Sequence, residues 1–224
     1  MTEASLKAWR SESFVADWAG EDVVADMLTL PRRISAAIVA DSGSAPTHVV
    51  DVGSGPGGYL RVFLSTFPQA RGTWTDTSPP MEVLGRAGLA EFGQRVTYRL
   101  GDAEHLAGIG LEPADVIVTS RMLHHFRAES LQRFYCDAFA LLVPGGFLFN
   151  LDHFSSPPGW EARYRRIRGQ FAGARKKELA NHRHEDTMLP LAENLAWIEA
   201  AGFEPPDTPW RTFFTALVAA QKPA

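Results

Sequence analysis

The chain has 224 residues, 45% of them hydrophobic and 21% charged, and this composition is that of a single globular domain rather than a disordered or collagen-like chain. The formal net charge of −4 argues against a function that depends on bulk attraction to nucleic acid or anionic lipid. The single cysteine, Cys136, excludes an internal disulfide and a cysteine-based zinc site. Because neither a signal peptide nor an apolar run of about 20 residues is present, we expect a cytoplasmic protein without a membrane partner.

The first 45 residues are predicted to be helical. Apolar residues recur at spacings of three and four from Leu6 to Leu28. Pro31 predicts the start of a second helix, because proline is tolerated in the first turn of a helix and not in its interior. Residues 41–46 are rich in serine, glycine and proline and predict a loop.

From residue 47 onward, short apolar runs alternate with helical patterns. The predicted strands are 48–52, 72–75, 95–100, 114–119 and 146–151, and the predicted helices are 59–67, 80–90 and 128–142. Such alternation is typical of right-handed crossovers between parallel strands, with helices on both faces of the sheet. We therefore expect an α/β fold with one doubly wound, mostly parallel sheet.

After residue 152 this alternation ends. Helices are predicted at 160–177 and 190–201, and two antiparallel strands at 203–209 and 211–220, joined by a tight turn that contains proline. The expected organisation is a single domain. Its parts are a helical N-terminal cap (1–45), a cofactor-binding core (47–152), a helical substrate insertion (153–201) and a terminal strand hairpin (202–222).

The loop after the first predicted strand is the most informative stretch. Gly53, Gly55, Gly57 and Gly58 lie between a buried strand and a helix, so the backbone can turn sharply and a ligand can approach it closely. Three of these glycines satisfy the G-x-G-x-x-G pattern of dinucleotide-binding proteins. Asp51, however, argues against a dinucleotide, because a carboxylate is unfavourable beside a pyrophosphate. It is suited instead to bind a cationic amino group of a ligand or to brace the loop through hydrogen bonds.

The pattern of Asp51 followed by Gly53, Gly55 and Gly57 resembles motif I of the class I S-adenosylmethionine-dependent methyltransferases. Later segments resemble further motifs of that family in the same order, namely 72–81, 99–104, 114–126, 142–147 and 213–222. The resemblance implies a Rossmann-like, seven-stranded sheet with an antiparallel last strand. It also implies that S-adenosyl-L-methionine lies across the carboxyl ends of the first, second and fourth strands.

The same resemblance implies roles for individual residues. Asp76 would hold the two ribose hydroxyls, while Asp102 would accept from the adenine amino group and Ala103 would donate its backbone amide to the ring. The predicted cofactor-binding residues are Asp51, Gly53, Ser54, Gly55, Gly57, Asp76, Thr77, Met81, Asp102, Ala103 and Ser120. The alternative for these acids is that they cap helices or brace turns, although Ser78 is the better candidate for the helix cap that follows Asp76. Aromatic residues could close over the methionine moiety of the cofactor, and the alternative is that they pack in the core; these are Trp9, Trp18 and Tyr59.

Three histidines are the candidate catalytic residues. His124 and His125 follow the fourth strand, where the family places residues that face the acceptor, and His153 follows the fifth strand beside Asp152. Imidazole titrates near neutral pH and can act as a general base, but a base is needed only when the acceptor must lose a proton. The alternative for each histidine is therefore that its ring braces a loop through a hydrogen bond or lies exposed to solvent. Arg121 either holds an anionic acceptor or pairs with a surface acid.

Two polar stretches lie in the predicted insertion. The first contains side chains that can bind a metal ion, namely His182, His184 and Glu185. The sequence offers no second group of ligands elsewhere to complete a metal site, so we expect a polar loop and no metal. Residues 161–178 contain seven basic and two acidic residues. This basic stretch is a solvated helix face, a recognition element for a small anionic acceptor, or a tRNA contact.

We expect a methyltransferase that acts on a small-molecule acceptor, with transfer to oxygen, nitrogen or carbon left open, as a monomer or homodimer. The alternatives are an enzyme of the same fold that remodels the cofactor, such as a carboxy-S-adenosylmethionine synthase, a tRNA-modification enzyme, and a non-catalytic cofactor- or RNA-binding protein. A nicotinamide-dependent enzyme is disfavoured because none of the four tyrosines begins a Tyr-x-x-x-Lys pair.

Overall fold

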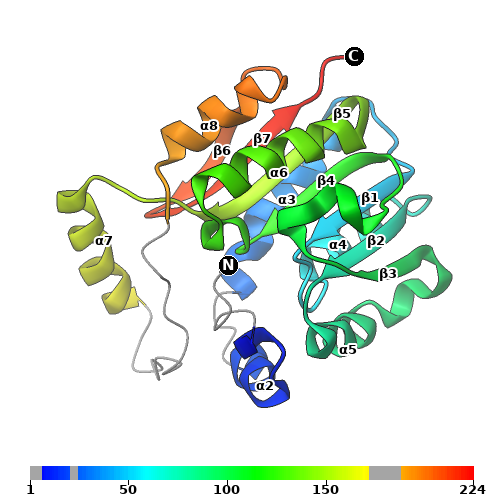
Figure 1. Cartoon of the computed structure of the whole chain (residues 1–224), viewed down its shortest axis with the longest axis horizontal. Helices are drawn as coiled ribbons and strands as arrows, with labels where there is room; N and C mark the ends of the chain where they lie inside the picture. Colours follow the sequence, from blue (N-terminus) through cyan, green and yellow to red (C-terminus); the bar gives the residue numbers. More distant parts are fainter. Residues whose placement is uncertain (1–6, 21–24, 172–187) are drawn as a thin grey trace.

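A central seven-stranded sheet organises the computed structural model, which describes residues 7–20, 25–171 and 188–224 (Figure 1). The strand order is β3-β2-β1-β4-β5-β7-β6. The strands are β1 (His48–Val52), β2 (Arg71–Asp76), β3 (Val96–Leu100), β4 (Ala114–Ser120), β5 (Leu142–His153), β6 (Asp207–Thr212) and β7 (Thr215–Gln221). Strand β7 pairs antiparallel with both β5 and β6, and the other pairs are parallel, which confirms the predicted Rossmann-like fold with an antiparallel last strand.

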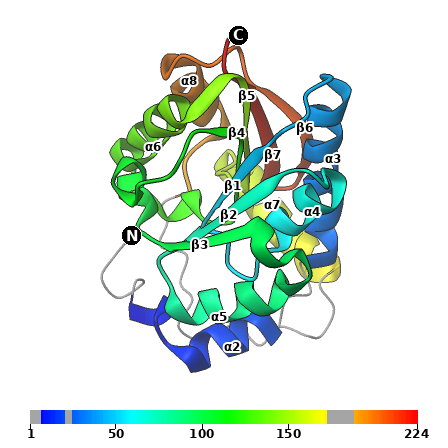
Figure 2. The same ribbon diagram turned by 90° about the vertical axis from the view of Figure 1, so that its right-hand side faces the viewer.

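Helices cover both faces of this sheet. The described helices are α2 (Glu12–Gly20), α3 (Ala25–Asp41), α4 (Gly58–Thr66), α5 (Pro79–Gly88), α6 (Ala128–Leu141), α7 (Pro158–Phe171) and α8 (Leu191–Ala200), with short 3-10 helices η1 (Ala90–Arg95), η2 (Ala103–Ile109) and η3 (Leu123–His125). Helices α3 and α4 lie on one face, and α6 and α8 lie on the other (Figure 2). None of the described helices is long and apolar enough to cross a membrane.

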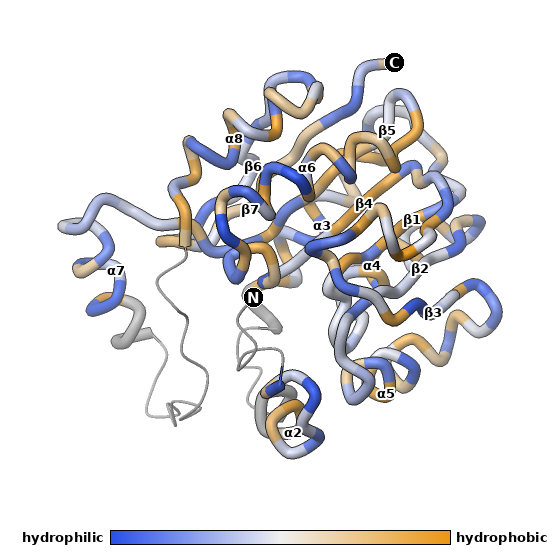
Figure 3. Tube along the Cα trace, viewed as in Figure 1, coloured by the Kyte–Doolittle hydropathy of each residue, from blue (hydrophilic) through white to orange (hydrophobic). Residues whose placement is uncertain are grey.

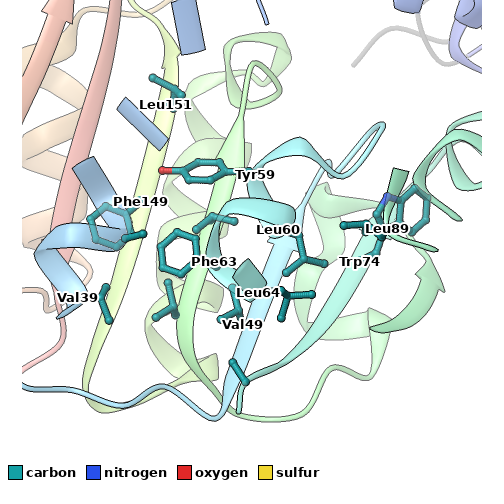
Figure 4. Packing of buried hydrophobic residues seen from close by; sticks show 14 of the residues in the cluster. Val39, Val49, Tyr59, Leu60, Phe63, Leu64, Trp74, Leu89, Phe149 and Leu151 are labelled. Carbon is teal, nitrogen blue, oxygen red and sulfur yellow. The ribbon is translucent and has the colours of Figure 1, made fainter. Parts of the chain in front are cut away.

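Each face of the sheet has its own hydrophobic core. Tyr59, Phe63, Trp74 and Phe149 belong to the cluster beneath α3 and α4 (Figure 4). The other cluster lies beneath α6 and α8. All five residues of β1 are buried, as expected for a central strand covered on both faces, and the central strands are among the most hydrophobic parts of the chain (Figure 3). This rigid centre fixes where the loops at the carboxyl ends of the strands lie.

The prediction that Pro31 starts a helix is wrong. Pro31 lies inside α3, which begins at Ala25. A proline in a helix interior removes one backbone hydrogen bond and costs about 3 kcal/mol. The helix persists because its inner face is buried against the sheet, with Ala36 and Val39 almost inaccessible to solvent.

The prediction of a proline-containing turn before residue 211 is also wrong. Pro209 lies within β6, an edge strand whose pairing with β7 shifts register between Asp207 and Trp210. Proline has no backbone N–H to donate, so an edge strand tolerates it at a position where no hydrogen bond to the neighbouring strand is needed. The turn of this hairpin instead lies at Phe213 and Phe214, and Phe213 has a φ of 55°.

Candidate functional site

A cavity of about 250 Å³ opens at the carboxyl ends of β1, β2 and β4, with the loop after β3 at its edge. Of the eleven cofactor-binding residues predicted from the sequence, ten line this cavity. The exception is Gly57, which begins α4 with a φ of 84° and packs against Leu89. Gly57 therefore shapes the helix start, whereas Gly53 and Gly55 face the cavity.

The glycine loop is held against β2 by its own backbone. The amides of Gly53 and Ser54 donate to Thr75 O over 2.9 and 3.0 Å, and Trp74 Nε1 donates to Gly55 O over 2.8 Å. Gly53 has a φ of 67°, and a Cβ there would lie 2.6 Å from Met122 Cγ. The loop therefore needs glycine at this position, both for its conformation and for its contact with the loop after β4.

Asp51 braces the start of α4 and lines the cavity. Its Oδ2 accepts from the amide of Leu60 over 3.1 Å. Burial raises the pKa of Asp51 to about 6, although the Leu60 amide and the Arg32 guanidinium oppose this shift. A cationic group bound beside this carboxylate would favour its ionised form.

Asp76 connects the glycine loop to α5. Its Oδ2 accepts from the amide of Gly55 and its Oδ1 from the amide of Ser78, each over 3.0 Å. Burial raises the pKa of Asp76, and these hydrogen bonds oppose the shift. Ser78 caps α5 by accepting from the amide of Met81 over 3.3 Å, as expected. The carboxylate is thereby oriented while it lines the cavity.

Asp102 occupies a more open position. It caps η2 through a 3.0 Å hydrogen bond from the amide of Glu104 to Oδ1, and its side chain is 46% exposed. The capping role raised as an alternative is therefore present, although Asp102 and Ala103 both line the cavity.

Two cavity residues come from the helical N-terminal region. Arg32 on α3 lines the cavity with its guanidinium 5.7 Å from the centre of the Tyr59 ring. Sequence reasoning missed Arg32, because no motif marks it and only tertiary packing brings α3 beside α4. Trp9 also lines the cavity, and its carbonyl oxygen accepts from Ser78 Oγ. The side chain of Trp18 lies outside the described residues.

The end of β4 forms the opposite side of the cavity, which we call the acceptor wall. Its lining residues are Ser120, Arg121, Met122, His125 and Phe126. Arg121 has a φ of 53°, a left-handed conformation that is rare for residues other than glycine. The amide of Arg121 donates to Leu151 O over 3.0 Å, which ties the wall to β5.

A buried contact between His124 and Asp152 supports the acceptor wall. His124 Nδ1 lies 2.6 Å from Asp152 Oδ1, and their side chains are 3% and 1% exposed. Asp152 Oδ2 also accepts from the amides of Met122 and His124 over 3.1 Å each. Burial raises the pKa of Asp152, but the charge and hydrogen bond of His124 outweigh it, so the pKa lies well below its ordinary value. The carboxylate is ionised and fixes the loop above it.

The three predicted catalytic histidines occupy different places. His125 lines the cavity, and its ring centre lies 3.9 Å from that of His124. His124 lies behind it and is not among the described residues that line the cavity. His153 Nδ1 lies 3.0 Å from Thr215 Oγ1, and its ring centre lies 5.1 Å from that of His124. Of the three, only His125 lines the cavity among the described residues.

Part of the predicted basic helix can be placed. Arg163, Arg165 and Arg166 lie exposed on α7, and Arg165 pairs with Glu161 at 2.6 Å. The side chain of Arg168, residues 175–177 and the histidines at 182 and 184 lie outside the described residues. Within the described ranges, no group of three or more His, Cys, Asp or Glu side chains could hold a metal ion.

The comparison with protein families agrees with this geometry. Residues 49–146 match the family model of a methyltransferase domain. This segment therefore resembles the methyltransferase domain expected from the sequence. A solved structure, that of an O-methyltransferase family protein from Burkholderia thailandensis, has the same fold, with a TM-score of 0.69 and 21% identity over 97% of this chain and 64% of its own.

Curated relatives of this chain differ in their described activities. Aclacinomycin 10-hydroxylase RdmB of Streptomyces purpurascens is 32% identical over 63% of this chain and 38% of its own length. Trans-aconitate 2-methyltransferase of Streptomyces avermitilis is 29% identical over 80% and 64%. The tRNA1(Val) (adenine(37)-N6)-methyltransferase of Porphyromonas gingivalis is 26% identical over 92% and 87%. The chain thus spans less than two thirds of the first two of these relatives.

The cavity fits the cofactor of this family, S-adenosylmethionine. Its backbone cradle depends on Gly53, where a side chain would collide with Met122. Among the described residues, Thr75 Oγ1 and Ser120 Oγ are buried at the cavity without a hydrogen-bond partner. Buried hydroxyls of this kind are normally satisfied, so a polar ligand in the cavity would supply the missing partners.

Proposed function

We propose that this protein is a class I S-adenosylmethionine-dependent methyltransferase, that it transfers a methyl group to an oxygen atom of a small-molecule acceptor, and that His125 is its general base. The observation that carries the proposal is the position of His125 on the acceptor wall of the same cavity that holds the glycine loop. Transfer to a hydroxyl oxygen releases a proton. An imidazole near its own pKa at neutral pH is suited to take that proton.

The residues at the ends of β1, β2 and β3, which we call the donor wall, would hold the cofactor. Asp51 would accept from its amino group, Arg32 would bind its carboxylate, and Asp76 would accept from its ribose hydroxyls. Met81 and Ala103 would contact the adenine. When bound, S-adenosylmethionine supplies an activated methyl group on a sulfonium.

The acceptor wall would position the acceptor for an in-line displacement. Because positioning supplies much of the rate of such a step, the wall must hold its geometry. Asp152 does this by accepting from the amides of Met122 and His124. His124, which contacts Asp152, packs against His125 with the two rings tilted, and it would act as a positioning residue that fixes the His125 ring.

Label transfer from methyl-labelled S-adenosylmethionine to small hydroxylated aromatic compounds, catechol among them, tests the assignment. His125→Asn is expected to lower kcat by about 100-fold or more and to remove the rise of the rate between acid and neutral pH. His124→Asn should lower kcat while keeping that rise, because it acts through His125. His153→Asn should keep both the rate and the profile. A wild-type rate and profile for His125→Asn would refute the base assignment.

One observation favours a second candidate, a tRNA acceptor. Helix α7 exposes Arg163 and Arg166 beside Trp160, which is 50% exposed and lies 4.8 Å from the Arg163 guanidinium. Exposed arginines next to an aromatic ring suit single-stranded RNA. A gel shift with tRNA that is lost in the double variant Arg163→Gln, Arg166→Gln, together with methyl transfer to tRNA, would favour this candidate over a small acceptor.

A further inference from the structure

Thr75 carries a buried hydroxyl at the wall of the cavity. It is the last residue but one of β2, it is 1% exposed, and it lines the cavity. Its backbone oxygen accepts from the amides of Gly53 and Ser54. Its Oγ1, by contrast, has no hydrogen-bond partner among the described residues. Because buried hydroxyls are normally paired, a hydroxyl of this kind at a cavity is suited to a polar group of a ligand.

A second threonine of the same strand shows the difference. Thr73 lies two residues before Thr75, so the two side chains lie on the same face of the sheet. The Oγ1 atom of Thr73 lies 2.8 Å from His48 Nε2, and Thr73 is not among the described residues that line the cavity. Along this row, the hydroxyl away from the cavity is therefore paired within the protein, and the one at the cavity is not.

The face on which Thr75 lies indicates the part of the ligand that it meets. Thr75 pairs in register with Val52, which belongs to the hydrophobic cluster beneath α6 and α8. Ala103, the first residue of η2, packs against the same cluster and lines the cavity. The next residue of β2, Asp76, points to the opposite face, as side chains alternate along a strand. Thr75 therefore faces the side of the cavity where η2 begins.

We propose that Thr75 is a specificity-determining residue whose Oγ1 donates a hydrogen bond to a ring nitrogen of the cofactor's adenine. This inference rests on the proposed function, in which Ala103 contacts the adenine and Asp76 accepts from the ribose hydroxyls. The ring nitrogens of adenine accept hydrogen bonds, and a threonine hydroxyl can donate one. Successive residues of β2 would thus bind the base and the sugar of the same nucleoside.

Calorimetry with S-adenosylhomocysteine and its 1-deaza, 3-deaza and 7-deaza analogues tests this inference, because each analogue replaces one ring nitrogen of adenine by CH. The wild type is expected to bind at least one analogue about 10-fold more weakly than S-adenosylhomocysteine, since the Thr75 hydroxyl then has no acceptor. Thr75→Val keeps the shape of the side chain without its hydroxyl. It should bind S-adenosylhomocysteine about 10-fold more weakly and no longer distinguish it from that analogue. Thr75→Ser should keep the distinction.

Thr119→Val is the matched control. Thr119 on β4 is completely buried, and its Oγ1 also has no hydrogen-bond partner among the described residues. It is not, however, among the described residues that line the cavity. Replacing an unpartnered buried hydroxyl by a methyl group of similar shape should not destabilise the fold, so both variants should unfold at or above the urea midpoint of the wild type. Binding should change in Thr75→Val and not in Thr119→Val.

The outcomes separate this inference from the proposed function. A wild-type protein that does not bind S-adenosylhomocysteine would contradict the proposed function itself. If it binds, the inference is overturned when Thr75→Val binds as tightly as the wild type, or when the wild type binds all three analogues as tightly as S-adenosylhomocysteine. It is also overturned when Thr75→Val binds more weakly but keeps the wild-type distinction among the analogues. A lower urea midpoint of Thr75→Val alone would assign the hydroxyl a structural role instead.

Discussion

The donor wall and the acceptor wall of the cavity are built in different ways. The donor wall is fixed by hydrogen bonds within and between the loops that follow neighbouring parallel strands, such as those that Asp76 accepts from Gly55 and Ser78. The acceptor wall depends on the buried contact between His124, in η3, and Asp152, near the end of β5, and on the left-handed residue Arg121. The donor wall therefore follows from residues at the ends of strands, whereas the acceptor wall depends on how side chains of β5 and of the loop after β4 pack together.

The largest expected effect comes from the acceptor wall. Asp152→Asn replaces a buried carboxylate that accepts from His124 and from three backbone amides, and disrupting such a buried charged group costs about 3–5 kcal/mol. Urea unfolding should show a loss of this size in the free energy of unfolding. Asp207→Asn, at an exposed aspartate on the edge strand, should stay within about 0.5 kcal/mol of the wild type. Equal losses in the two variants would contradict the supporting role of Asp152.

The next largest effect is expected where the two walls touch. Gly53→Ala combines a left-handed φ with a Cβ that would lie 2.6 Å from Met122 Cγ. Together these should destabilise the folded state by about 2–4 kcal/mol and move both loops. Binding of S-adenosylhomocysteine should become undetectable by calorimetry. Gly108→Ala is the matched control because a Cβ there meets nothing within 4 Å, and it should bind as the wild type does.

Within the donor wall, the two strand-end acids should differ. Asp76→Ala removes a largely buried carboxylate that accepts from two amides, and it should weaken S-adenosylhomocysteine binding by about 100-fold. Asp102→Ala removes a carboxylate that is 46% exposed and accepts from one amide, and its effect should be about tenfold smaller. Calorimetric titrations of both variants measure the ratio. A larger loss for Asp102→Ala would reverse this ranking.

Sequence reasoning found most of the donor wall because its signals are local. Asp51, Asp76 and Asp102 each stand where a predicted strand ends, and the carboxyl ends of parallel strands meet at one edge of the sheet. The fold class of the core followed from the alternation of strands and helices, whereas the strand order is known only from the structure. The two errors, at Pro31 and Pro209, arose because buried packing and an edge position override the usual preferences of proline.

The acceptor wall could not be predicted in the same detail. The sequence placed His124, His125 and His153 near the cavity but could not show that one ring lines it while another pairs with Asp152. That difference depends on side-chain directions set by the loop between β4 and α6. Arg32 was missed for a similar reason, since its place in the cavity depends on how α3 packs on α4.

The smallest expected effect is a pH dependence of the donor wall. The pKa of Asp51 is raised to about 6 in the folded protein, so protonated Asp51 stabilises the unliganded fold below about pH 4, and this contribution is lost as the pH rises through about 6. The cofactor's amino group instead needs the ionised form. The affinity for S-adenosylhomocysteine should therefore rise about tenfold between about pH 5 and neutral pH.

Asp51→Asn isolates this contribution. Arg32 and Asp76 also act on the Asp51 carboxylate, and the pKa of Asp76 is raised as well, so the comparison needs a variant that changes one group. The amide oxygen of asparagine can still accept from Leu60. The variant should bind more weakly at neutral pH and lose most of the pH dependence. An unchanged pH dependence would assign it to another group.

The most direct test of the two-wall account is calorimetric titration of S-adenosylhomocysteine into the wild type, Asp76→Ala and His125→Asn. We predict that the wild type and His125→Asn bind with the same Kd, because His125 belongs to the acceptor wall, and that Asp76→Ala binds about 100-fold more weakly. A wild-type chain that does not bind, or a His125→Asn variant that loses binding as Asp76→Ala does, would contradict the division of the cavity into donor and acceptor walls.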